Sequence, residues 1–181
     1  TQLLRELKEF RGVSRMRISR AMESAFRAQK KYEDEVYDEG LRYIEYADKN
    51  GLTIAVLSGR PYHIDPEINH GINQLIASCE MAVITEDVAA RLAEVPQVNV
   101  LNQWTYHSRM YASAEYVKNK QNAQLIQLVS FGCGIDSITS DEIRSIVEES
   151  GKIYTQLKID EINNLGAARI RIRSLKAAID R

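Results

Sequence analysis

Cysteine is scarce in this sequence, which holds only Cys79 and Cys133 among 181 residues. Two thiols are too few for a disulfide framework, and no segment has the pattern of a secretory signal. Hydrophobic residues make up 44% of the chain, which is enough to build a core without covalent cross-links. We therefore expect a cytoplasmic protein in which both cysteines are thiols.

Long hydrophobic runs and a net excess of one charge are also lacking. No uninterrupted apolar run approaches the roughly 20 residues that cross a bilayer, which argues against membrane insertion. The formal net charge is −1, so electrostatics gives no reason to expect nucleic acid as a partner. The charges are unevenly distributed, however: Lys and Arg dominate residues 1–31, and Asp and Glu dominate residues 32–50. Such a separation of basic and acidic residues is typical of a solvated helical face, or of a docking surface for a partner or a neighbouring domain.

Proline is absent from the first fifty residues, whose apolar spacing favours helix, with an interruption or kink expected near Gly12 and Gly40. The pair Asn50-Gly51 predicts the end of this helix, because glycine adopts the left-handed conformation at little cost. We therefore expect residues 1–50 to form a helical lead-in or interdomain connection, and residues 51–181 to form a separate domain.

The chain begins at Thr1 without a methionine and ends abruptly at Arg181, so we expect it to be a piece of a longer polypeptide.

Strand-like and helix-like segments alternate from residue 51 onward, which is typical of a parallel sheet flanked by helices. The expected fold class is α/β: an open, mainly parallel sheet of about five strands, flavodoxin-like or Rossmann-like, preceded by the helical extension. Asp65 and Pro66 predict the start of the first helix after a strand. Thr139 and Glu142 have the spacing of a capping box, which predicts a helix start near residue 140. The predicted strands cover residues 53–57, 81–85, 97–101, 124–129 and 152–157.

Cys133 is the most informative residue, because it lies between Gly132 and Gly134 just after an apolar segment that ends at Val129. The carboxyl ends of parallel strands meet at one edge of the sheet, so a cysteine there is placed to contact a ligand. The glycines leave the sulfur accessible, and the start of the following helix favours the thiolate. Cys79 falls on the apolar face of a predicted helix, and we expect it in the core.

Two other loops at the same predicted edge hold most of the remaining reactive side chains. The first contains Arg60, Tyr62 and His63 and leads into a helix, so it resembles a phosphate-binding turn, although it lacks the glycine-rich patterns of nucleotide-binding loops. The second contains Trp104 and His107. If the strand order is 2-1-3-4-5, the first and third loops flank the switch point and His63 faces His107 across the crevice.

Three kinds of chemistry are compatible with the cysteine loop. Covalent catalysis would need a base such as His63 or His107 within hydrogen-bond reach of the thiol. A zinc site would combine Cys133 with histidines, although no two of these ligands have a recognised close spacing. An iron–sulfur cluster needs more thiolates than the chain holds, so its other ligands would come from elsewhere.

Four segments carry a more specific signal: Gly59–Gly71, Asn102–His107, Phe131–Asp136, and Lys158–Glu161 with Asn164–Arg171. On these motifs the sequence resembles the acyl-CoA dehydratase activase-related proteins. In that family, a homologue of the 2-hydroxyacyl-CoA dehydratase subunits is joined to ATPase domains of the 2-hydroxyglutaryl-CoA dehydratase activator type. The resemblance covers about residues 51–178 and implies a piece of the dehydratase-like region.

The resemblance implies a role in ATP-driven, low-potential electron transfer in anaerobic metabolism, in which an activator passes an electron to an iron–sulfur cluster of a dehydratase. It implies that Cys133 is a metal ligand of a [4Fe-4S] or related cluster in the full-length protein. The cofactor site would be shaped by Gly132, Gly134, Arg60, Tyr62, His63, Trp104 and His107. The expected partners are other domains of the same polypeptide, including an activator-type ATPase, and an acyl-CoA.

The ATPase signature and the partner cysteines are missing from this chain, so we expect it to be neither an ATPase nor a competent electron donor by itself. One alternative is a binding module without its own catalysis, in which Arg60 and the helix start near Pro66 hold an acyl-CoA phosphate or another anion. A second alternative is a metal-dependent hydrolase that uses His63, His107 and Cys133.

Overall fold

The computed structural model describes residue 6 and residues 14–130, 134–159 and 165–180. The chain divides into two compact units, Thr1–Glu39 and Gly40–Arg181, and each is described by itself. A long helix, α2 (Arg15–Asn50), supplies most of the described part of the first unit and the first element of the second. Among the described residues, we find no helix with the length and apolarity needed to span a bilayer.

Helix α2 continues through Gly40 without interruption, so the predicted kink at this residue is wrong, and Gly12 lies outside the described residues. A Cβ atom at Gly40 would lie 2.4 Å from Cγ1 of Val88, which belongs to helix α5 (Glu86–Ala89). Glycine is therefore needed here for close packing of two helices. Helix α2 ends at Asn50, and Gly51 follows with a φ of 63°, which confirms the predicted helix end.

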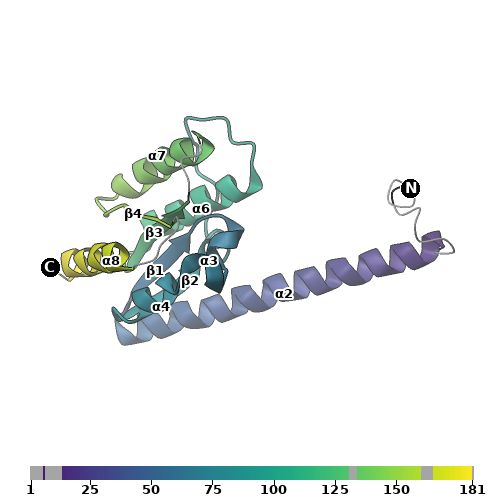
Figure 1. The fold of residues 1–181 in the computed structure, drawn as a ribbon, viewed down its shortest axis with the longest axis horizontal. Helices are drawn as coiled ribbons and strands as arrows, with labels where there is room; N and C mark the ends of the chain where they lie inside the picture. Colours follow the sequence, from purple (N-terminus) through teal and green to yellow (C-terminus); the bar gives the residue numbers. More distant parts are fainter. Residues whose placement is uncertain (1–5, 7–13, 131–133, 160–164, 181) are drawn as a thin grey trace. The chain divides into compact units, whose positions relative to one another are not determined.

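The second unit is an α/β fold built on one parallel sheet, as expected from the alternation of segments (Figure 1). Strand β1 pairs with both β2 and β3, so that Val56 lies level with Ile84 on one side and Leu125 on the other. The central strands are almost completely buried, as is typical of parallel sheets covered on both faces. The order is β2-β1-β3-β4, with β1 Thr53–Ser58, β2 Met81–Thr85, β3 Ala123–Val129 and β4 Thr155–Lys158.

The predicted strand at residues 97–101 is wrong, because this segment is irregular and four strands, rather than five, form the sheet in the described part of the chain. The backbone N–H of Asn99 donates to Oε2 of Glu142 at 3.1 Å, and Leu101 is 81% exposed. The segment thus bonds to a side chain of helix α7 (Gly134–Glu148) and not to a strand.

The predicted capping box is also wrong, because α7 begins at Gly134, five residues before Thr139. The hydroxyl of Thr139 donates to the carbonyl oxygen of Ile135 inside the helix at 2.9 Å. Glu142 instead accepts the bond from Asn99. Both partners of the expected box therefore have other contacts that a local spacing pattern does not encode.

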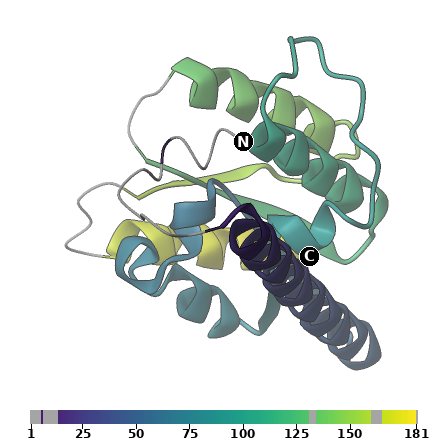
Figure 2. The same cartoon turned by 90° about the vertical axis from the view of Figure 1, so that its right-hand side faces the viewer.

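Helices cover both faces of the sheet (Figure 2). On one face lie α4 (Ile72–Ala77) and α8 (Gly166–Ile179), and on the other lie α6 (Thr105–Asn119) and α7. Cys79 packs against the core on the α4 and α8 side, as expected. That core consists of Ala55, Leu57, Ile72, Leu75, Ile76, Met81, Ile126, Leu128, Leu157, Ile159, Ala168, Ile172 and Leu175.

The connection from β1 to β2 contains three short helices: η1 (Pro61–Ile64), α3 (Pro66–Asn69) and α4. The side chain of Asp65 accepts a bond from the backbone N–H of Glu67 at 2.9 Å, which confirms the predicted N-cap. His70 and Gly71 then take positive φ values of 51° and 79°, which ends α3 and turns the chain into α4. His70 is exposed.

Candidate functional site

The strand order places a topological switch point between β1 and β3. Helix α4, which follows β1, lies on one face of the sheet, whereas α7, which follows β3, lies on the other (Figure 2). Ligands of open α/β sheets bind where such neighbouring connections diverge. The segments that flank this point are therefore the first loop, with Arg60 and His63, and the segment after β3, which includes Ser130 and the start of α7.

His63 is the buried link between these two segments, with only 2% of its surface exposed. Its Nδ1 accepts a bond from the backbone N–H of Arg60 at 3.0 Å, and its Nε2 lies 2.8 Å from Oγ of Ser130. Because Nδ1 is an acceptor, the neutral ring carries its proton on Nε2 and donates to Ser130. The pKa of His63 is lowered to about 4, mainly by burial and in smaller part by the charge of Arg60, against the opposing effect of Asp136.

Gly59 makes this position of the imidazole possible. A Cβ atom at residue 59 would lie 2.5 Å from Nδ1 of His63 and 3.2 Å from the carbonyl oxygen of Leu128. Any side chain at this position would displace the ring or the end of β3. Glycine at residue 59 is thus explained by the approach of His63.

Arg60 forms the second link across the switch point. Its Nε and Nη2 donate to Oδ1 of Asp136 at 3.1 and 2.7 Å. Asp136 lies in the first turn of α7, where the helix dipole also favours a negative charge. The guanidinium is therefore partly neutralised by this carboxylate, which leaves less of its charge for the external anion that a phosphate-binding role would require.

His107 belongs to the same electrostatic group, although it comes from α6. It is 8% exposed, and its pKa is lowered by burial and by the charge of Arg60, while Asp136 opposes the shift. Trp104 precedes α6, is 55% exposed, and meets the His107 ring edge-on with 6.2 Å between the ring centroids. Tyr62 is 38% exposed and contacts the His63 ring in a similar way, with 4.5 Å between centroids.

Cys133 and Gly132 lie outside the described residues, so their predicted roles rest on the sequence. Gly134 is the first residue of α7, and no atom of the described residues lies within 4 Å of a Cβ atom built on it. Among the described residues, no group of three or more His, Cys, Asp or Glu side chains has the arrangement of a metal site. The chain holds only two cysteines, and Cys79 packs against the core, so an iron–sulfur cluster that uses Cys133 would need further ligands from elsewhere.

A buried ion pair at the end of β2 was not predicted. Glu86, the first residue of α5, is 3% exposed and accepts a bond from Nη2 of Arg109 in α6. Burial raises the pKa of Glu86 to about 7, against the opposing effect of Arg109. Arg109 belongs to none of the sequence motifs, and its partner is 23 residues away along the chain, so no local spacing could indicate the pair.

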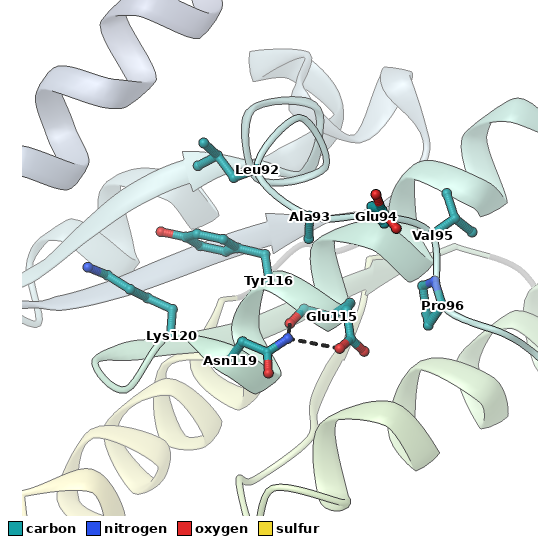
Figure 3. Close-up of a pocket in the computed structure, with 9 residues that line it drawn as sticks. All are labelled: Leu92, Ala93, Glu94, Val95, Pro96, Glu115, Tyr116, Asn119 and Lys120. Carbon is teal, nitrogen blue, oxygen red and sulfur yellow. Dashed lines mark hydrogen bonds between the residues drawn. The ribbon is translucent and has the colours of Figure 1, made fainter.

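A hollow of about 530 Å³ lies between α6 and the segment that follows α5 (Figure 3). Figure 3 shows Glu115, Tyr116 and Asn119 of α6, and Lys120 just after it, opposite the loop residues 92–96. Glu115 and Asn119 bond to each other, with 2.8 Å between Oε1 and Nδ2. The Tyr116 hydroxyl is buried and has no hydrogen-bond partner among the described residues, and burial raises its pKa to about 12. None of the predicted site residues lines this hollow.

Residues 1–89 match the family model described as the CoA enzyme activase uncharacterised domain. The matched stretch runs from the helical lead-in to the end of α5 and includes the Gly59–Gly71 motif, but it does not reach α6, β3 or α7. No curated protein and no solved structure matches the chain. The match supports the relation to CoA-enzyme activases that the motifs indicate, and it extends this relation to the helix that precedes β1.

Proposed function

We propose that this chain is a dehydratase-like domain of a 2-hydroxyacyl-CoA dehydratase or activase-type protein, and that it contributes Cys133 to an iron–sulfur site shared with other domains. The family match over residues 1–89 supports the relation to CoA-enzyme activases. The four sequence motifs indicate the dehydratase-like part of such a protein.

The bonding across the switch point is the observation that carries this proposal. Residues on both sides of Cys133 in the sequence are tied to the first loop: Ser130 bonds to His63, and Asp136 bonds to Arg60. The segment that contains the cysteine therefore starts and ends at the edge where open α/β sheets bind their ligands. A ligand held there by Cys133 would lie against the two anchored loops.

The two anchoring residues have different tasks in this proposal. His63 positions the segment after β3 and is not itself a metal ligand, because both ring nitrogens already have partners at 2.8–3.0 Å. Arg60 holds Asp136 in the first turn of α7, and the amino end of this helix would stabilise a thiolate and an anionic centre. His107 and Trp104, at the start of α6, would shield the same edge from water.

An iron–sulfur cluster, when bound, would accept and release single electrons, which is the chemistry that a low-potential activation step requires. This chain holds only two cysteines, and Cys79 packs against the core on the α4 and α8 side. The remaining ligands would therefore come from other domains, which would also supply ATP hydrolysis.

Anaerobic reconstitution of the full-length protein with iron and sulfide tests the proposal. We expect Cys133→Ala to lose cluster iron and the visible absorption of the cluster. Cys79→Ala is the matched control and should retain both, since it removes the other thiol without touching the switch point. If Cys133→Ala keeps the iron content and the spectrum of the unchanged protein, Cys133 is not a ligand and the proposed role is wrong.

A further inference from the structure

Helix α2 carries an exposed apolar surface in the unit Thr1–Glu39. Met16, Met22, Phe26 and Tyr32 are between 41% and 67% exposed, and the helix is described from Arg15 onward. A single helix gains most of its stability from packing of an apolar face, so a long helix with this much exposed apolar surface needs a partner.

Met22 and Tyr32 belong to a continuous stripe whose end residues, Ile18 and Val36, are half-buried. Positions 18, 22, 25, 29, 32 and 36 follow the alternating spacing of four and three residues that places side chains along one face of a paired helix. They are occupied by Ile18, Met22, Ala25, Gln29, Tyr32 and Val36, of which only Gln29 is strongly polar. Met16 and Phe26 lie off this stripe.

The stripe is symmetric about Arg27, so it matches the same stripe on a second, antiparallel copy of the helix. When two copies of the helix run antiparallel with their Arg27 residues at the same level, Ile18 of one copy lies opposite Val36 of the other. In the same way, Met22 lies opposite Tyr32, and Ala25 lies opposite Gln29. Each large side chain thus meets another large one, and the single polar residue meets the smallest one. Arg27 itself lies on the far side of the helix from the stripe, so two copies of it do not meet.

The charges have the same symmetry. The basic end carries Arg15, Arg17 and Arg20, whereas the other end carries Glu33, Asp34, Glu35, Asp38 and Glu39. In the reversed register Arg15 lies opposite Glu39, and the basic end of one helix lies beside the acidic end of the other. A parallel arrangement would place like charges together along the whole length, which is unfavourable.

We propose that residues 15–39 of α2 pair with the same segment of a second copy of this chain, as an antiparallel two-helix interface centred on Arg27. The paired segment would be about 36 Å long, at about 1.5 Å per residue. The interface is isologous, since each copy supplies the same surface to the other.

Sedimentation equilibrium of the 181-residue chain over a concentration series tests the interface, and a monomer at every concentration would overturn it. We expect the unchanged chain to dimerise and Met22→Glu to weaken the dimer by about tenfold or more, because a charge would enter the apolar stripe. Met16→Glu is the matched control, since Met16 is 61% exposed but lies off the stripe, and it should change the dimer constant less than about twofold. Equal effects of the two variants would contradict the proposed register. Circular dichroism confirms that each variant keeps its helix.

Cysteine cross-linking tests the antiparallel direction, in a background in which Cys79 and Cys133 are replaced by alanine. An equal mixture of Ile18→Cys and Val36→Cys chains should form a cross-linked heterodimer under mild oxidation, and Ile18→Cys alone should form none. Efficient cross-linking of Ile18→Cys with itself, and none in the mixture, would show a parallel arrangement and overturn the proposal.

Discussion

The two edges of the sheet both contain polar side chains that are partly or fully buried, but the hydrogen bonds of these side chains go to different kinds of partner. At the carboxyl edge, Arg60 and His63 bond to Asp136 and Ser130, and these side-chain bonds join two loops. At the amino edge, Nζ of Lys152 donates to three backbone carbonyl oxygens at distances between 2.5 and 3.0 Å.

The hydrogen-bond partners distinguish Lys152, which has a structural role, from Arg60 and His63, which belong to the candidate site. The carbonyls bonded by Lys152 belong to Val117, Lys120 and Ala123, where α6 ends and β3 begins, and such helix-end carbonyls have no donor inside the helix. All three N–H groups of the ammonium group therefore donate to backbone carbonyl oxygens. At the carboxyl edge the bonds instead set the positions of two loops that flank a switch point, which is where a ligand would bind.

The largest effect is expected from a methyl group added at the carboxyl edge. Gly59→Ala should destabilise the fold by about 3 kcal/mol, because the new Cβ would overlap the buried His63 ring and force it to move. Urea unfolding measures the loss. Gly134→Ala adds the same group at the start of α7, where nothing lies within 4 Å, and should change stability by less than about 0.5 kcal/mol. Equal losses would mean that the His63 contact is not what requires glycine at residue 59.

A smaller loss is expected at the amino edge. Lys152→Met keeps the apolar stem but removes the donor to three carbonyl oxygens, and it should cost about 2 kcal/mol of unfolding free energy. Lys30→Met removes an exposed ammonium that pairs with Asp34 and should cost less than about 0.5 kcal/mol. A loss from Lys152→Met no larger than that of the control would show that the cation does not stabilise the end of α6.

The smallest effect is a pH dependence that only the carboxyl edge should show. The pKa of His63 is lowered from 6.5 to about 4 in the folded state, so protonation favours unfolding. The stability that the neutral ring contributes is present above pH 6.5 and is lost as the pH falls toward 4. Relative to His63→Gln, the chain should lose about 1 kcal/mol more between pH 7 and about pH 5.5. Parallel stability curves for the two proteins would show that His63 is not held neutral by the fold.

The sequence was most informative where local pattern and tertiary packing agree. The predicted strand at residues 81–85 is β2, and the expected helix start at Asp65 and Pro66 is the start of α3. The prediction for residues 97–101 failed because two alternating valines resemble a strand, whereas pairing depends on an available sheet edge. The strand predicted at residues 152–157 begins only at Thr155, because Lys152 donates a hydrogen bond to a carbonyl oxygen near the end of α6.

The predicted site residues were found partly together. The sequence placed Arg60, His63 and His107 at one edge of the sheet, and the three are coupled electrostatically in the structure. The third predicted loop would flank the switch point only in the five-strand order 2-1-3-4-5, and this order does not occur because residues 97–101 are not a strand; Ser130 and the start of α7, which follow β3, flank it instead. The role of Cys133 stays a prediction.

By itself, the sequence determined the α/β class, the end of α2 at Asn50-Gly51 and the concentration of reactive side chains after the strands, because these follow from hydrophobic period and turn chemistry within short windows. Only the tertiary structure decided that His63 meets Ser130, 67 residues away, and that Glu86 meets Arg109, 23 residues away. Such contacts depend on strand order and helix placement, which bring distant segments together without any local pattern that marks the pair.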